Sequence, residues 1–153
     1  MQKKFMNSAI KEAQKAVLKD EVPIGAVVVM NGKIIARAHN LMEKTQLATA
    51  HAEILAINKA CKKLKSWRLD DAELYVTVEP CAMCAGAIAN ARIKKVYFGA
   101  YENKSGCAIS KFPVLTDNGL NHVTEFEGGV EQEICANIIK SYFKSKRIRK
   151  SLD

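Results

Sequence analysis

Three side chains that can ligate a metal lie in two short motifs of the chain. His51 belongs to the stretch TAHAEI at residues 49–54, and Cys81 and Cys84 belong to EPCAMC at residues 79–84. Zinc (Zn2+) accepts a neutral imidazole and two thiolates in tetrahedral geometry, and three protein ligands leave the fourth position to water. Each motif opens an alanine-rich stretch typical of a helix, whose start favours thiolates. The pattern predicts a catalytic zinc site.

Glu53 follows His51 by two residues and therefore points to a different side of the same helix. From the first helical turn its carboxylate can take a proton from water at the metal and later deliver it to a leaving group. The alternative is a closed structural zinc site, in which Glu53 has no purpose. Such a site needs a fourth ligand, for which the chain offers Cys61, Cys107, Cys135, His39 and His122.

Length and composition indicate a single domain over residues 1–153 that can bury a sizeable core. The sequence has no apolar run of the roughly 18 residues that a membrane span needs. Charged side chains interrupt the N-terminal region before the apolar part of a signal peptide can form. The C-x-x-C pair then indicates metal or redox chemistry rather than a disulfide framework. We expect a cytoplasmic protein with no membrane partner.

The net charge of +8 is concentrated in two places. One is the segment 62–68 (KKLKSWR); the other is the C-terminal stretch, with Lys140, Lys144, Lys146, Arg147, Arg149 and Lys150. From charge alone, RNA binding and a solubilising surface are equally good explanations. Beside the basic residues, Phe143 can line an RNA surface with Lys146 and Arg147, since aromatic and basic groups suit unpaired nucleotides. Core packing is the alternative for Tyr142 and Phe143.

The apolar periodicity predicts alternating strands and helices. Strands are expected at residues 22–30, 33–39, 72–78, 95–98 and 122–127, with a hairpin turn at Asn31-Gly32. Helices are expected at residues 2–18, from Thr49 as N-cap to about Lys65, and at residues 82–90 and 131–146. Residues 40–49 are expected to form a loop, and residues 101–119 to form loops around one short helix.

This alternation predicts an α/β fold, a three-layer α-β-α sandwich whose five-stranded mixed sheet contains one hairpin and later parallel crossovers. Both helices with metal ligands follow extended chain. Their N-termini can therefore meet at one edge of the sheet.

The pattern H-x-E followed by P-C-x-x-C is the signature of zinc-dependent nucleobase deaminases. Over nearly its whole length the sequence resembles the bacterial tRNA-specific adenosine deaminases of the cytidine deaminase superfamily. The further stretches that carry the resemblance are residues 22–29, 74–81, 83–87, 92–93, 98–100, 104–106 and 121–122. Where the family usually has Asp-Pro before Thr49 this chain has Leu47-Ala48, and Glu102 replaces an aspartate in the loop after the fourth strand.

The resemblance implies a cytidine deaminase-like fold and a zinc-dependent hydrolase that converts adenosine to inosine at the wobble position of a tRNA anticodon stem-loop, with an arginine tRNA as the expected substrate. It implies that His51, Cys81 and Cys84 hold zinc and that Glu53 moves protons during catalysis. Asn40 is implied to hydrogen-bond the nucleoside. The family forms homodimers in which the partner subunit helps to frame the site.

Two other function classes compete with RNA editing. A deaminase of a free nucleobase such as guanine or cytosine would share the metal motif, but it would not need a basic C-terminal helix. A non-catalytic RNA-binding module with structural zinc would keep its full function after Glu53→Gln, whereas the enzyme would lose turnover and retain zinc.

Overall fold

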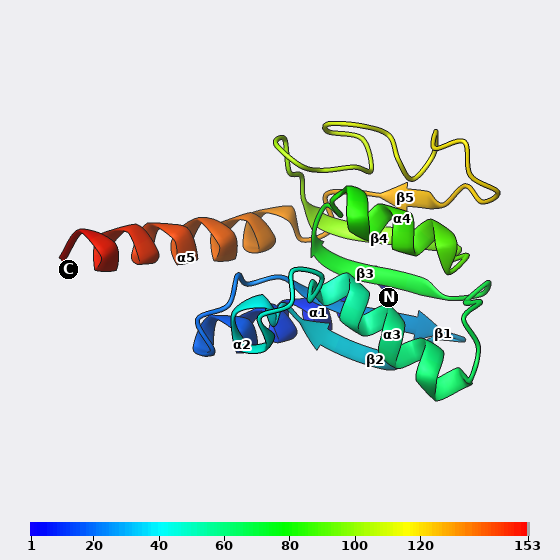
Figure 1. Ribbon diagram of the computed structural model, residues 1–153, viewed down its shortest axis with the longest axis horizontal. Helices are drawn as coiled ribbons and strands as arrows, with labels where there is room; N and C mark the ends of the chain where they lie inside the picture. Colours follow the sequence, from blue (N-terminus) through cyan, green and yellow to red (C-terminus); the bar gives the residue numbers. More distant parts are fainter. Residues whose placement is uncertain (153) are drawn as a thin grey trace.

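The structure is a computed structural model that describes residues 1–152, and its centre is one mixed five-stranded sheet in the order β2-β1-β3-β4-β5 (Figure 1). The strands are β1 (Gly25–Met30), β2 (Lys33–His39), β3 (Glu73–Val78), β4 (Lys95–Ala100) and β5 (Glu125–Glu127). β1 pairs antiparallel with β2 and β3, whereas β3, β4 and β5 run parallel. This is the predicted combination of one hairpin with later crossovers.

Helices cover both faces of the sheet. They are α1 (Gln2–Leu18), α2 (Met42–Thr45), α3 (Ala52–Leu64), α4 (Ala82–Asn90) and α5 (Gln132–Leu152). One buried cluster packs α3 and α4 against the sheet through small residues such as Ala56 and Ala85, together with Ile88. A second cluster packs α1 and the first turns of α5 against the opposite face. The three-layer α-β-α prediction is therefore confirmed.

Strand direction determines where the two motif helices begin. β1 is antiparallel to both of its neighbours, so β2 and β3 point the same way and end at the same edge of the sheet. α3 starts after the loop that follows β2, and α4 starts directly after β3. The helix N-termini that carry the two motifs therefore meet at the carboxyl edge of these strands, the usual place for ligands in α/β sheets.

Local sequence explains the hairpin and the start of β1. Asn31 and Gly32 both have positive φ (51° and 74°), which matches the twist of a two-residue turn between antiparallel strands. β1 was predicted from residue 22 but begins at Gly25. Pro23 has no N–H for a ladder hydrogen bond, so the chain pairs only after it.

Four other predictions on secondary structure were wrong. The fifth strand was predicted from residue 122, but β5 begins at Glu125. The loop at 40–49 contains the short helix α2, and residues 101–119 contain no helix at all. α5 was predicted to end near residue 146 but continues to Leu152, because its last turns are rich in residues that tolerate a solvated helix and end in Arg149 and Lys150, which suit the helix C-terminus. Beyond Tyr142 every described residue of α5 is exposed, and this half projects from the body (Figure 1).

None of the helices at residues 1–152 is both long enough and apolar enough to cross a membrane.

Candidate metal centre and active site

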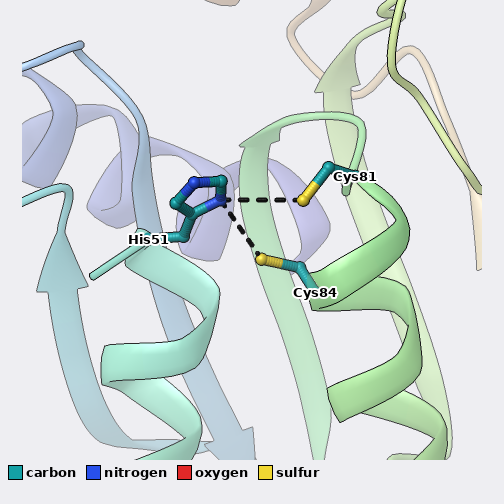
Figure 2. A group of neighbouring side chains, drawn as sticks. All are labelled: His51, Cys81 and Cys84. Carbon is teal, nitrogen blue, oxygen red and sulfur yellow. Dashed lines mark hydrogen bonds between the residues drawn. The ribbon is translucent and has the colours of Figure 1, made fainter. Parts of the chain in front are cut away.

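The three predicted ligands come together at the N-termini of α3 and α4 (Figure 2). Nδ1 of His51 lies 3.7 Å from Sγ of Cys81 and 3.5 Å from Sγ of Cys84. Bond lengths of about 2.1 Å to nitrogen and 2.3 Å to sulfur at a tetrahedral angle require an N···S separation of about 3.6 Å. The donor types and their spacing therefore fit zinc, with Nδ1 as the histidine ligand.

Backbone conformation places each ligand. His51 and Cys81 are the N-cap residues of α3 and α4, and both are extended, with ψ of 150° and 177°. An extended N-cap turns its side chain across the helix start, while Cys84 reaches the same point from the first turn. The free N–H groups of both helix starts add positive potential, which suits thiolates.

Electrostatics within the cluster favour a thiolate. The hydrogen bond from the Cys84 thiol lowers the pKa of Cys81 to about 4, and a further hydrogen bond from His51 acts in the same direction against burial. The pKa of Cys84 is raised because its thiol hydrogen-bonds to Cys81 and is buried. A second thiolate therefore needs a nearby cation, and a zinc ion held by these residues would supply that charge.

Glu53 follows the candidate ligand His51 by two residues and is not part of the cluster of three candidate ligands. Its side chain is 3% exposed, and burial raises its pKa to about 7. Oε1 of Glu53 is the one buried side-chain oxygen or nitrogen of residues 1–152 without a hydrogen-bond partner. An unpaired buried carboxylate oxygen is costly and usually has a functional reason. This oxygen is free to accept a proton from a water molecule in the site.

Asn40 shapes the start of α3. It is 3% exposed, and its Oδ1 accepts a hydrogen bond of 2.7 Å from the backbone N–H of Ala52, the first residue of the helix. The capping role predicted for Thr49 was therefore wrong, since the cap oxygen comes from a residue twelve positions before the helix. Among the described residues, no hydrogen bond involves Nδ2 of Asn40, so this amide group is left to donate elsewhere.

Glu79, which sequence reasoning missed, holds the loop after β4 against the site. Glu79 is 3% exposed, and its carboxylate accepts five hydrogen bonds. Four come from the backbone N–H groups of Glu102, Ala108, Ile109 and Ser110, and the fifth comes from the hydroxyl group of Ser110. The same loop donates from Cys107 N–H to the carbonyl of Pro80, next to the first cysteine ligand. These bonds replace secondary structure in the loop.

Gly106 lets the loop wrap around this carboxylate. A Cβ at position 106 would collide with the Glu79 carboxyl group and with the carbonyl oxygen of Glu102. In the sequence, the signal for this close approach was Gly106 itself, a glycine in the loop that follows the fourth strand. The acceptor residue itself lies 27 positions earlier in the chain and gave no local signal.

The aromatic pair of α5 divides into a core residue and a surface residue. Tyr142 is 5% exposed and donates from its hydroxyl to Oδ1 of Asp20 (3.0 Å), whereas Phe143 is 38% exposed. The ammonium group of Lys146 lies 5.7 Å from the Tyr142 ring centroid, and Arg147 is exposed. The structure thus leaves Phe143, Lys146 and Arg147 at the surface of α5 and does not place them among the metal ligands.

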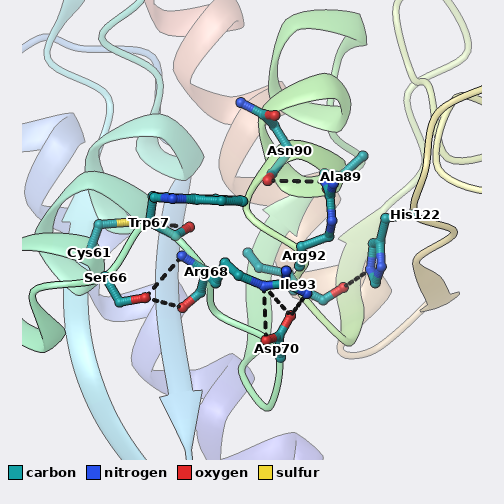
Figure 3. A network of polar contacts seen from close by, with 10 residues as sticks. All are labelled: Cys61, Ser66, Trp67, Arg68, Asp70, Ala89, Asn90, Arg92, Ile93 and His122. Atoms are coloured by element: carbon teal, nitrogen blue, oxygen red, sulfur yellow. Dashed lines mark hydrogen bonds and ion pairs between the residues drawn. The ribbon is translucent and has the colours of Figure 1, made fainter.

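The second basic segment lies at the opposite end of α3 from the metal ligands. There Trp67, 61% exposed, has the guanidinium groups of Arg68 and Arg92 within 6 Å of its ring centroid (Figure 3). A 13-residue helix separates this cluster from His51 by about 20 Å.

The other cysteines and histidines do not complete a closed site. Nδ1 of His39 bonds to Oε1 of Glu12, and Nε2 of His122 bonds to the carbonyl of Ile93. Within residues 1–152, the one group of three or more potential ligands is the His51, Cys81 and Cys84 cluster. The structural zinc alternative therefore lacks its fourth ligand.

Comparison with known proteins agrees with this site. A family model of MafB19-like deaminases matches residues 1–147. A tRNA-specific adenosine deaminase of Bacillus subtilis (strain 168) is 51% identical over 146 residues, which cover 95% of this chain and 91% of the relative. The chain belongs to the family of tRNA-specific adenosine deaminases.

The fold of this family member also resembles solved structures of deaminases. A structure from work on A-to-I editing by tRNA:A34 deaminases matches with a TM-score of 0.86 and 43% identity, over 88% of this chain and 98% of that one. A guanine deaminase of Bacillus subtilis matches with a TM-score of 0.62 and 44% identity, over 64% and 63%. The match to the tRNA deaminase structure therefore covers more of both chains.

Proposed function

We propose that the protein is a hydrolase that converts adenosine to inosine, with release of ammonia, at the wobble position of a tRNA anticodon, and that an arginine tRNA is its substrate. The observation that carries this proposal is the zinc-type spacing of the His51, Cys81 and Cys84 donor atoms beside the unpaired Oε1 of Glu53. The names of the relatives supply the adenosine and the tRNA.

We assign a role to each residue of the site, and its position supports that role. His51, Cys81 and Cys84 would hold zinc, which supplies a Lewis acid that makes a water molecule more acidic. Glu53 takes the proton of the attacking water, delivers it to the N1 position of the adenine ring and then assists departure of the amino group as ammonia. Its raised pKa, near 7, suits a group that both accepts and donates a proton at neutral pH.

Substrate recognition is assigned to two regions. Nδ2 of Asn40 donates to the nucleoside, since Oδ1 of the same side chain is already engaged at the start of α3. Phe143, Lys146 and Arg147 contact the RNA from the exposed surface of α5. The bases of an anticodon loop are unpaired, which lowers the cost of moving the target base into the site.

We propose further that the chain is one domain that acts as a homodimer in the cytoplasm. One sheet with both faces covered supports a single domain. The segment after β4 exposes Ile109, Phe112, Leu120 and Val123 by more than half, and these are apolar side chains that a second copy would cover. All five cysteines are free, in keeping with a reducing compartment.

The direct test is inosine formation by the zinc-loaded protein, with an arginine-tRNA anticodon stem-loop compared with free adenosine, guanine and cytosine under identical conditions. Deamination of the stem-loop alone is expected. Activity on a free base without activity on the stem-loop would contradict the RNA substrate and leave the metal chemistry intact.

A further inference from the structure

A basic pocket lies where the end of α1, the short helix α2 and the projecting half of α5 meet. Its cavity of about 420 Å³ is lined by Lys19, Asp20, Glu43, Lys44 and Lys146. Figure 1 shows these three elements on the side of the molecule from which α3 and α4 begin. Three segments distant in the sequence thus bring three ammonium groups to one opening near the active-site edge.

The ammonium group of Lys19 is held in place without being neutralised. Its Nζ lies 3.0 Å from Nε2 of His39, and an ammonium has no acceptor, so Nε2 must accept. Nδ1 of the same ring then donates to Oε1 of Glu12 at 3.0 Å. The other oxygen of Glu12 is paired with Lys15 at 2.6 Å. The carboxylate of Glu12 therefore pairs with Lys15, and the ammonium group of Lys19 has no carboxylate partner.

Lys146 is held in a similar manner from α5. Its ammonium lies 5.7 Å from the Tyr142 ring centroid, a cation–π contact that leaves the charge unpaired. Tyr142 is in turn fixed by its hydrogen bonds to Asp20. Oδ1 of Asp20 also accepts from Arg149 at 3.1 Å, so this carboxylate of the pocket already has a cationic partner.

The third lysine is carried by α2, which is pinned by a buried carboxylate. Glu21 is 1% exposed and accepts from the backbone N–H groups of Glu43 (2.9 Å) and Lys44 (2.7 Å). The side chain of Lys44 is exposed at the pocket, as is that of Glu43, whose charge opposes it. With Asp20 engaged by Arg149, three ammonium groups face one free carboxylate.

We propose that this pocket binds a backbone phosphate of the substrate RNA, next to the nucleotide that enters the active site. A phosphodiester carries a negative charge that can pair with the three lysine ammonium groups. Because these ammonium groups are exposed, they suit a ligand that stays at the protein surface. The position fits, because Lys44 lies in the loop that runs from Asn40 to His51, and His39 is the residue before Asn40. The pocket thereby fixes the position of the RNA strand relative to the active site. This proposal rests on the proposed function.

The test compares two triple variants with the same change of charge. One replaces Lys19, Lys44 and Lys146 by glutamine, and the other replaces Lys62, Lys63 and Lys65 at the far end of α3. Binding of a fluorescent anticodon stem-loop with inosine already at the wobble position avoids turnover. Affinity is measured by anisotropy from low to high salt, and thermal unfolding verifies that each variant is folded.

The pocket variant is expected to bind at least tenfold more weakly at low salt, with a log–log salt slope shallower by about 0.7 for each phosphate that it no longer neutralises. The far-end variant should keep an affinity within about twofold of the unaltered protein, because the lysines that it replaces lie far from the bound RNA. Single replacements of Lys19 and Lys44 provide folded substitutes if the triple variant is unstable, and each should weaken binding more than Lys62→Gln.

Equal losses of affinity in the two triple variants would overturn the pocket and leave only nonspecific attraction to a basic protein. Failure of the unaltered protein to bind the stem-loop would overturn both the pocket and the RNA substrate. Normal binding with salt behaviour as expected, but no inosine formation from the adenosine stem-loop, would sustain the pocket and contradict the proposed reaction alone.

Discussion

Removing the charge of Glu79 should release the loop after β4 while the rest of the fold persists. In Glu79→Gln the side-chain oxygen can still face the N–H groups of residues 108–110, but the new NH2 group then meets the N–H of Glu102, which loses its acceptor. Hydrogen bonds to a charged acceptor contribute about 1.5–3 kcal/mol and neutral ones about 0.5–1.5, and an unpaired buried donor costs about 1–3. Three hydrogen bonds that change from a charged to a neutral acceptor lose about 1 kcal/mol each, so we expect a loss of at least about 3 kcal/mol.

The assay combines unfolding with hydrogen exchange of the zinc-loaded protein. For a chain of this size, about 3 kcal/mol corresponds to a fall in Tm of about 6–12 °C. Exchange should increase in peptides that cover residues 101–112 and stay unchanged in α1, since the broken hydrogen bonds are local. Glu125→Gln is the matched control, because this glutamate is exposed on β5 and its replacement should change Tm by little.

Gly106→Ala approaches the same contact from the loop side, because its Cβ would meet the Glu79 carboxyl group. It should increase exchange in the same peptides, and Ser110→Ala, which removes one donor, should cost about 1 kcal/mol. A loss below about 1 kcal/mol in Glu79→Gln, or an exchange increase spread evenly over the chain, would refute the reasoning that this carboxylate organises the loop.

Four further outcomes are expected. Glu53→Gln should lower stem-loop deamination by about 10²–10⁴-fold with zinc per chain unchanged by metal analysis, and retained turnover would remove Glu53 from the chemistry. Chelation of zinc should lower Tm, and Tm should rise again with added zinc, whereas a Tm indifferent to zinc would contradict a metal bound to the His51, Cys81 and Cys84 cluster. Burial raises the pKa of Glu12, but hydrogen bonds from Lys15 and His39 outweigh it and hold that pKa below 4.5; the ionised carboxylate therefore stabilises the fold above pH 4.5, and this contribution is lost as pH falls through the lowered pKa. In urea unfolding, the difference in free energy of unfolding between the unaltered protein and Glu12→Gln should accordingly become smaller below pH 4.5. A difference independent of pH would be inconsistent with an ionised Glu12 bonded to Lys15 and His39. Deletion of residues 144–153 should weaken RNA binding and flatten its salt dependence with zinc content unchanged, so an unaltered salt slope would exclude the end of α5 as an RNA contact.

Local signals in the sequence were sufficient for most of the helices and strands and for the candidate metal ligands. The spacing of apolar residues in α1 and α4 and the Asn31-Gly32 turn act over a few residues, so the predicted bounds of these elements agree with the structure. The sequence also singled out His51, Cys81 and Cys84 as candidate ligands, because a metal restricts both residue type and placement at helix starts, and the structure brings them together. Family resemblance added the adenosine and the tRNA.

Tertiary structure alone decided which distant side chains act together. Asn40 rather than Thr49 caps α3, and Glu79 organises a loop more than twenty residues away, because buried polar groups take whichever partner the fold brings near. Tyr142 and Phe143 are adjacent in the sequence, yet Tyr142 is buried and hydrogen-bonded to Asp20 whereas Phe143 is exposed. Lys19, Lys44 and Lys146 share no pattern along the chain, since their meeting depends on how α1, α2 and α5 pack.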